Sequence, residues 1–155
     1  MKRKILSKLI EWKNKKNRKP LIVNGARQVG KTYILKEFGS HYYEKMAYVN
    51  CDKNKTLDKI FSQDYNISRI LLSLSAILHV NIEPENTLII FDEIQENPTV
   101  LNSLKYFCED ASQYHVAVAG SLLGISLHRD TSFPVGKVDM IKMYPMTFDE
   151  FLMAI

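Results

Sequence analysis

The sequence predicts an α/β fold with a mainly parallel sheet, on two observations. Short apolar runs rich in β-branched residues alternate with segments whose apolar residues recur at helical spacing, as in proteins whose strands are joined through helices. The first run, residues 21–23, is followed by a glycine-rich loop and then by a helical pattern over residues 33–38. In this order of strand, loop and helix, the loop can hold an anion at a helix N-terminus.

The loop at residues 25–32 reads Gly-Ala-Arg-Gln-Val-Gly-Lys-Thr and matches the phosphate-binding loop pattern. Its two glycines permit backbone angles and close approaches that a Cβ would obstruct, so successive N–H groups can turn toward a phosphate. Lys31 is expected to reach the β- and γ-phosphates, and the Thr32 hydroxyl to bind Mg²⁺. The alternative, an ordinary turn with a surface lysine, does not explain the flanking strand and helix. The predicted nucleotide-binding residues are Gly25, Ala26, Arg27, Gln28, Val29, Gly30, Lys31, Thr32 and Tyr33.

Length and composition fit a single soluble domain over residues 1–155. The chain is 46% hydrophobic and 25% charged, which is ordinary for a globular protein. No apolar run approaches the ~20 residues of a membrane span. The two cysteines and four scattered histidines show neither a disulfide framework nor a zinc pattern. These features predict a cytoplasmic protein with no membrane partner.

Residues 1–19 are strongly basic, with nine Lys or Arg and one acidic residue, so the rest of the chain is net acidic. Within this segment, residues 2–14 have the apolar spacing of an amphipathic helix. One interpretation is a packed helix with a solvated lysine face and a charged linker. The other is a positive arm that contacts nucleic acid phosphates. Only Trp12 could stack on a base, so recognition of single strands has little support.

Further elements are expected along the chain. The helix after the loop is expected to end at Gly39, and a second strand to cover residues 46–50. Residues 66–79 carry apolar residues on one helical face, which predicts a core helix. A polar turn at residues 83–86 introduces a third strand over residues 88–91.

Asp92 and Glu93 come directly after the third strand, where a phosphate-binding site places its acidic half. Asp92 is expected to hold Mg²⁺ through water while Thr32 holds it directly. Glu93 is expected to polarise the water that attacks the γ-phosphate. Alone, the pair could be the solvated end of a strand. Together with the loop at residues 25–32, it predicts a nucleotide site.

The remaining elements complete an alternating pattern. Asn97 and Pro98 are typical of a helix N-cap and first helical residue, and residues 115–119 predict a fourth strand. Ser121 after that strand could position the attacking water or cap a helix, and both roles stay open. A fifth strand is expected over residues 138–144, and residues 147–150 form a capping box that begins a helix.

Two features stand out near the end of the sequence. Arg129 and Lys137 could act on a nucleotide, here or in a neighbouring subunit, or could be surface charge. The helix begun at residue 147 has barely two turns before residue 155. We therefore expect a fragment of a longer chain.

The sequence resembles the AAA-type P-loop ATPase domain that begins a group of bacterial and archaeal proteins with a C-terminal domain of unknown function. The resemblance is carried by Arg-Lys-Pro at 18–20, the loop at 25–32, Phe-Asp-Glu-Ile-Gln at 91–95, Ala-Gly-Ser at 119–121 and residues 144–152. It implies a three-layer α/β/α sandwich with strand order 5-1-4-3-2, and ATP with Mg²⁺ as ligands. It also implies Glu93 as catalytic base and Ser121 as a polar sensor.

Two departures from that family matter. The family usually has Gly-Arg where this chain has Gly136 and Lys137, and Lys cannot reproduce a planar bidentate contact. Chains of the family continue further, so the helical lid and the C-terminal domain are expected to be absent here. Without a lid the nucleotide would stay wet, and turnover would be weak or silent.

We therefore expect an ATPase in which Lys31, Glu93 and Ser121 are catalytic, Thr32 and Asp92 bind Mg²⁺, and hydrolysis drives a conformational or partner-linked cycle. The partner could be a second copy of the chain or a protein bound through the C-terminal region, and nucleic acid could bind residues 1–19. The alternatives are a nucleotide switch without turnover, a DNA-binding subunit and a P-loop small-molecule kinase. Such kinases usually have an arginine-rich lid, which the sequence lacks.

Overall fold

The computed structural model of the protein describes residues 4–26, 29–121, 134, 136–145 and 152. Its strands are β1 (Leu21–Gly25), β2 (Lys45–Asn50), β3 (Thr87–Asp92), β4 (His115–Gly120) and β5 (Asp139–Met143). Its helices are α1 (Lys4–Asn14), α2 (Lys31–Tyr42), α3 (Lys55–Gln63), α4 (Ile67–Leu78) and α5 (Pro98–Asp110), with a short 3-10 helix η1 (Ile94–Glu96).

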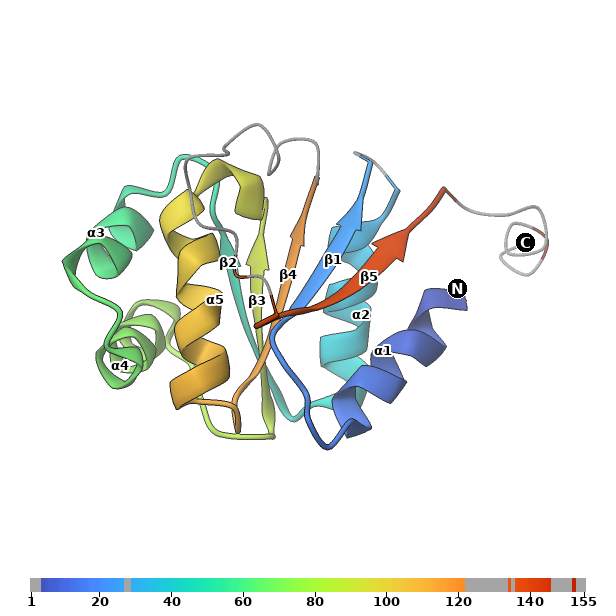
Figure 1. Ribbon diagram of the computed structural model, residues 1–155, viewed down its shortest axis with the longest axis horizontal. Coiled ribbons are helices and arrows are strands. Elements are labelled where there is room, and N and C mark those ends of the chain that lie inside the picture. Colours follow the sequence, from blue (N-terminus) through green and yellow to red (C-terminus); the bar gives the residue numbers. More distant parts are fainter. Residues whose placement is uncertain (1–3, 27–28, 122–133, 135, 146–151, 153–155) are drawn as a thin grey trace.

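The five strands form one parallel sheet in the order β2-β3-β4-β1-β5. Read from the other edge, this is the expected order 5-1-4-3-2, which is confirmed. Because the strands are parallel, their carboxyl ends lie at one edge of the sheet, at the top of Figure 1. Since β4 lies between β1 and β3, the carboxyl ends of these three strands are neighbours. In parallel sheets this edge is where ligands bind, beside the point where the strand order reverses.

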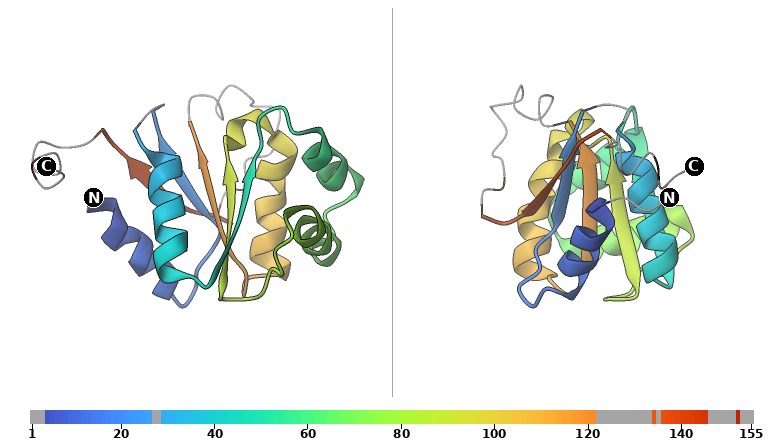
Figure 2. Two further views of the ribbon diagram at one scale, coloured as in Figure 1. Left: turned by 180° about the vertical axis from the view of Figure 1, so that it is seen from behind. Right: turned by 90° about the vertical axis from the view of Figure 1, so that its right-hand side faces the viewer.

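Helices cover both faces of the sheet, which confirms the three-layer sandwich (Figure 1). α1 and α2 lie on one face, and α3, α4 and α5 lie on the other, as the views from behind and from the side in Figure 2 also show. Alternate residues of β3 face opposite layers: Leu88 and Ile90 pack with the α2 side, whereas Ile89 and Phe91 pack with the α5 side. All four are fully buried, which explains why the strand is apolar throughout.

Asparagine side chains begin three of the helices. Asn97 caps α5 as expected, because its Oδ1 accepts a hydrogen bond from the backbone N–H of Val100 at 3.2 Å. Asn66 caps α4 in the same way. α4 buries Ile67, Ile70, Leu71 and Leu74, which confirms the predicted core helix, although Ile77 of the same predicted face is 40% exposed. Asn54 begins α3, a helix of nine residues that was not predicted because its sequence contains only three apolar residues, Leu57, Ile60 and Phe61.

Gly39 does not end the helix after the loop, contrary to expectation. α2 continues through it to Tyr42. A Cβ at Gly39 would lie 2.6 Å from Sδ of Met46 and 3.4 Å from Cδ2 of Leu88. The glycine therefore permits close packing of α2 against the sheet rather than a change of direction.

α1 is the packed amphipathic helix that one interpretation of the basic segment expected. Ile5, Leu9 and Trp12 are buried, and the Trp12 indole donates to the Lys19 carbonyl at 2.8 Å. Lys15 pairs with Asp139 of β5 at 3.0 Å. Within the described ranges no helix is long and apolar enough to cross a membrane. The capping box at 147–150 and Arg129 lie outside the described residues.

Candidate functional site at the carboxyl edge of the sheet

The two loop glycines serve different structural purposes. Gly30 has φ 92° and ψ 23°, a left-handed conformation that strains any residue with a Cβ. Gly25 is needed for close approach instead, since a Cβ there would lie 2.5 Å from the carbonyl oxygen of Met143 in the neighbouring strand. Val29 is buried in the core on the α2 side, and Ala26 is exposed. Arg27 and Gln28 lie outside the described residues.

Lys31 folds back over this loop. Its Nζ donates to the carbonyl oxygens of Gly25 at 2.9 Å and Ala26 at 2.7 Å. The ammonium group is thereby held at the loop, where the sequence predicts phosphates. Carbonyl oxygens are weaker partners for a cation than phosphate oxygens, so phosphate oxygens could replace these two contacts.

The first turn of α2 is open to an anion. Gly30 is its N-cap and has no side chain to cap the helix, and the first backbone bond of the helix runs from Ile34 to the Gly30 carbonyl at 3.0 Å. The N–H groups of Thr32 and Tyr33 therefore have no partner within the helix. Such groups, with the positive end of the helix dipole, favour a phosphate.

The carboxylate of Asp92 connects the loop helix to β3. Its Oδ2 accepts hydrogen bonds from the Thr32 hydroxyl at 2.7 Å and from the Tyr48 hydroxyl at 2.6 Å. Its Oδ1 accepts from the backbone N–H of Glu93 at 2.9 Å. Asp92 is only 4% exposed, so these three donors replace the water that burial removes. These three hydrogen bonds fix the positions of both Asp92 carboxylate oxygens.

Tyr48 was not predicted as a site residue. It lies on β2, which pairs with β3 so that Tyr48 is opposite Ile90 and its ring can reach Asp92. Burial raises the pKa of the Tyr48 hydroxyl, and its hydrogen bond to Asp92 raises it further. The phenol therefore stays protonated and donates. No sequence pattern marks this residue, because its role depends on which strand lies beside β3.

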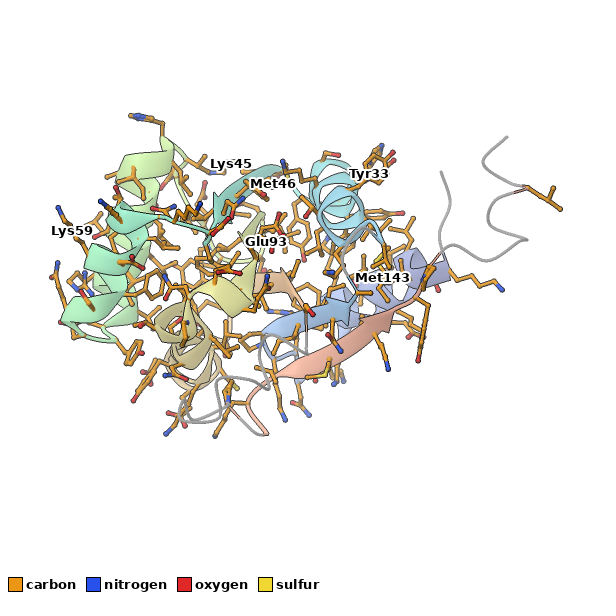
Figure 3. The ribbon with its side chains drawn as sticks, turned by 90° about the horizontal axis from the view of Figure 1, so that it is seen from above. Tyr33, Lys45, Met46, Lys59, Glu93 and Met143 are labelled. Carbon is orange, nitrogen blue, oxygen red and sulfur yellow. The ribbon has the colours of Figure 1, made fainter. Side chains whose placement is uncertain are left out.

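Glu93 lines the cavity beside the loop, with its side chain near the middle of the carboxyl edge in Figure 3. Its backbone is left-handed, with φ 54° and ψ 47°, which is uncommon for a residue with a long side chain. The side chain accepts a hydrogen bond from Nε2 of Gln95 at 2.6 Å. Gln95, which is 7% exposed, is a second residue that was not predicted.

Ser121 lines the same cavity at the end of β4, and its backbone N–H donates to Oε1 of Gln95 at 3.3 Å. The cavity has a volume of about 540 Å³ and is bordered by Lys31, Thr32, Glu93 and Ser121. All the predicted catalytic residues thus lie around one space. Asp52, after β2, also borders the cavity and was not expected. The residues that would follow a capping Ser121 lie outside the described part of the chain.

The side-chain oxygens of Thr32 and Asp92 fit the ligand preference of a magnesium ion. Mg²⁺ prefers oxygen ligands and usually takes one or two protein groups, completing its shell with water and substrate phosphates. Across the residues that the structure describes, no group of three or more His, Cys, Asp or Glu side chains could hold a metal ion. A hydroxyl and a carboxylate beside a phosphate site suit this ion better than a metal held by protein groups alone.

Cys51 and Lys137 do not fit a chemical role. Burial, followed by the charges of Asp92 and Asp58, raises the pKa of the Cys51 thiol to about 12, so it is neither a thiolate nucleophile nor a ready metal ligand. Lys137 pairs with Glu109 at 3.3 Å, which agrees with the interpretation of Lys137 as a surface charge.

Comparison with known proteins agrees with this arrangement. No curated protein matches the chain. A protein-family model described as an AAA domain matches residues 17–152, a range that includes the loop, the acidic pair and every strand. With a nucleotide-type site at the carboxyl edge of a five-stranded parallel sheet, the chain belongs to the AAA domain family.

Proposed function

We propose that this AAA domain binds ATP with Mg²⁺ and transfers the γ-phosphoryl group to water, and that the cycle drives a conformational change or a partner. The observation that carries the proposal is the 2.7 Å hydrogen bond between Thr32 and Asp92. It joins the N-terminus of the loop helix to the acidic end of β3, the two halves of a P-loop site.

Binding would rest on the loop and on the start of α2. The N–H groups of Thr32 and Tyr33 at the helix N-terminus favour the phosphates. The Lys31 ammonium would exchange its contacts with the Gly25 and Ala26 carbonyls for phosphate oxygens, which bind a cation more strongly. Tyr33 is 53% exposed at the mouth of the cavity, where it could contact the nucleoside.

Thr32 and Asp92 would hold Mg²⁺, which when bound neutralises charge on the β- and γ-phosphate oxygens. Tyr48 supports this site through its hydrogen bond to the same Asp92 oxygen that accepts from Thr32. A carboxylate held by several donors keeps its orientation, and orientation of the ligands is what a metal site requires from the surrounding protein.

Glu93 would orient the attacking water and accept its proton, since it lines the cavity and directly follows Asp92 in the chain. Lys31 would stabilise the charge that develops on the transferred group. Ser121, which lines the same cavity at the end of β4, could hold the same water through its hydroxyl. A positioned general base of this kind contributes about 10²- to 10⁴-fold to a rate.

The test is ATP binding and phosphate release with and without Mg²⁺, using paired variants. Lys31→Ala is expected to lose nucleotide binding, whereas Lys59→Ala, which removes an exposed lysine on α3 away from the cavity (Figure 3), should bind normally. Glu93→Gln is expected to keep ATP and lose turnover, whereas Glu11→Gln on the exposed face of α1 should match the parent. Hydrolysis at the parent rate by Glu93→Gln would contradict the role of Glu93 as base.

The same assay separates the other classes. ADP release that requires an added acceptor would indicate a kinase, and ATP binding without turnover would indicate a switch. The assay should also use GTP in place of ATP, because only the resemblance to ATPases favours ATP over GTP as the nucleotide. A salt-dependent shift of duplex DNA that is lost on deleting residues 1–19 would indicate nucleic acid binding through the basic segment.

A further inference from the structure

We propose that Gln95 is a positioning residue that connects the carboxylate of Glu93 to the end of β4 and so sets the orientation of the base. The inference rests on the proposed hydrolysis, in which Glu93 orients the attacking water. It assigns a role to a residue that lines the cavity but was not predicted as a nucleotide-binding or catalytic residue.

The two ends of the Gln95 amide contact two different parts of the site. Nε2 donates to Oε2 of Glu93 at 2.6 Å, and Oε1 accepts from the backbone N–H of Ser121 at 3.3 Å. The chemistry of the partners determines the orientation of the amide. A carboxylate can only accept and a backbone N–H can only donate, so reversing the amide would lose both bonds.

The backbone around Glu93 brings the two side chains together. Glu93 is left-handed and begins the turn of η1, and the N–H of Glu96 returns to its carbonyl at 3.0 Å. This turn folds Gln95 back beside Glu93 instead of letting the chain continue in the direction of β3. A conformation that is uncommon for glutamate is thus held where it places the carboxylate and the amide on the same side.

Gly120 provides the space that Gln95 occupies. A Cβ at this position would lie 2.7 Å from Oε1 of Gln95 and 2.5 Å from Cγ2 of Ile94. Both atoms belong to side chains rather than to the backbone. An alanine here would therefore displace the Gln95 amide, and the glycine permits the end of β4 to fit against η1.

These contacts form a continuous connection from the end of β4 through the Gln95 amide to the Glu93 carboxylate. Gln95 is 7% exposed, so little water can replace a bond that is lost. A movement of Ser121 would be transmitted to Glu93 through one side chain. A purely packing role would instead predict that only the stability of the fold depends on Gln95.

The test compares Gln95→Met, which keeps the length of the side chain but removes its amide, with Gly120→Ala, which keeps the amide but displaces it. The double variant and the control Gln63→Met, on an exposed residue of α3, complete the set. The measurements are kcat and KM for ATP with Mg²⁺, and hydrogen exchange of the Ser121 amide by NMR. Gln95→Met keeps the test valid if the alanine variant does not fold.

We expect Gln95→Met to lower kcat by about 10- to 100-fold, part of what a positioned base contributes, while KM stays within about threefold of the parent. The Ser121 amide should exchange about three to ten times faster, the effect of one lost hydrogen bond. Gly120→Ala should reproduce both changes, and it should also shift the Ile94 side chain. Because both substitutions disrupt the contact of the Gln95 amide, the loss of kcat in the double variant should be less than the sum of the two single losses.

An unchanged kcat in Gln95→Met, a change confined to KM, or additive losses in the double variant would overturn the proposal. Unchanged exchange of the Ser121 amide would overturn it as well. A parent protein that binds ATP without hydrolysing it would contradict the proposed hydrolysis. The connection through Gln95 would then still be decided by the exchange of the Ser121 amide in Gln95→Met.

Discussion

His115, at the start of β4, makes the stability of this fold dependent on pH. It is 4% exposed, and its Nδ1 lies 2.6 Å from the Tyr43 hydroxyl. The rings of Tyr43 and Trp12 meet its ring edge-on, with centroids 5.3 and 5.9 Å away. Burial, followed by the charges of Arg18 and Lys13, lowers the pKa of His115 from 6.5 to about 4. The folded protein therefore holds this side chain neutral.

The sign of the effect follows from the two pKa values. The unfolded chain takes up the proton near pH 6.5, whereas the folded chain does so only near pH 4. The stability that neutral His115 contributes is therefore fully present above pH 6.5 and is lost progressively as the pH falls to 4. At about 1.4 kcal/mol for each pH unit, the loss is at most about 3 kcal/mol. Since solvent screens Arg18 and Lys13, we expect between about 1 and 3 kcal/mol.

Urea unfolding of the parent and of His115→Gln, across about pH 7.5 to 4.5, measures this contribution. Carboxylates also titrate in this range, but they do so in both proteins, so the difference between the two isolates His115. His41→Gln, which changes an exposed histidine of α2, serves as the matched control. If the free-energy difference between parent and His115→Gln does not change with pH, His115 is not held neutral by the fold.

Three further substitutions test the site and its support. Gly30→Ala should lower the free energy of unfolding by about 1–2 kcal/mol in thermal unfolding, because a Cβ strains the left-handed backbone. It should also weaken ATP binding in titration calorimetry, and an unchanged affinity would contradict the role of the Gly30 backbone conformation. Tyr48→Phe should cost about 1–2 kcal/mol in urea unfolding, because Asp92 loses a buried donor, and should raise the Mg²⁺ concentration needed for turnover. Asn97→Ala should cost about 1 kcal/mol through loss of the α5 cap, with ATP binding unchanged; a loss of binding would show that this cap affects the site.

Much of the site could be predicted from the residues because its chemistry is local. The loop at residues 25–32 carries its glycines, lysine and threonine within one short segment, and the acidic pair directly follows an apolar run typical of a buried strand. The asparagine cap and proline at the start of α5 are equally local. Resemblance to a known family, rather than spacing, supplied the order of the strands.

The residues that were not predicted depend on neighbours that are distant in the chain. Tyr48 reaches Asp92 only because β2 pairs with β3. Gln95 meets Ser121 only because β4 lies beside β3. Gly39 looks like the end of a helix until Met46 is seen against it.

A short pattern thus identifies which side chains can hold phosphate or magnesium, because those properties belong to residue types and to the backbone angles of a few neighbours. How these side chains are oriented follows from the parallel sheet, which brings residues 32, 48 and 92 within hydrogen-bond distance. Packing of buried strands sets that arrangement. Such packing involves the whole chain, so no single segment of the sequence records it.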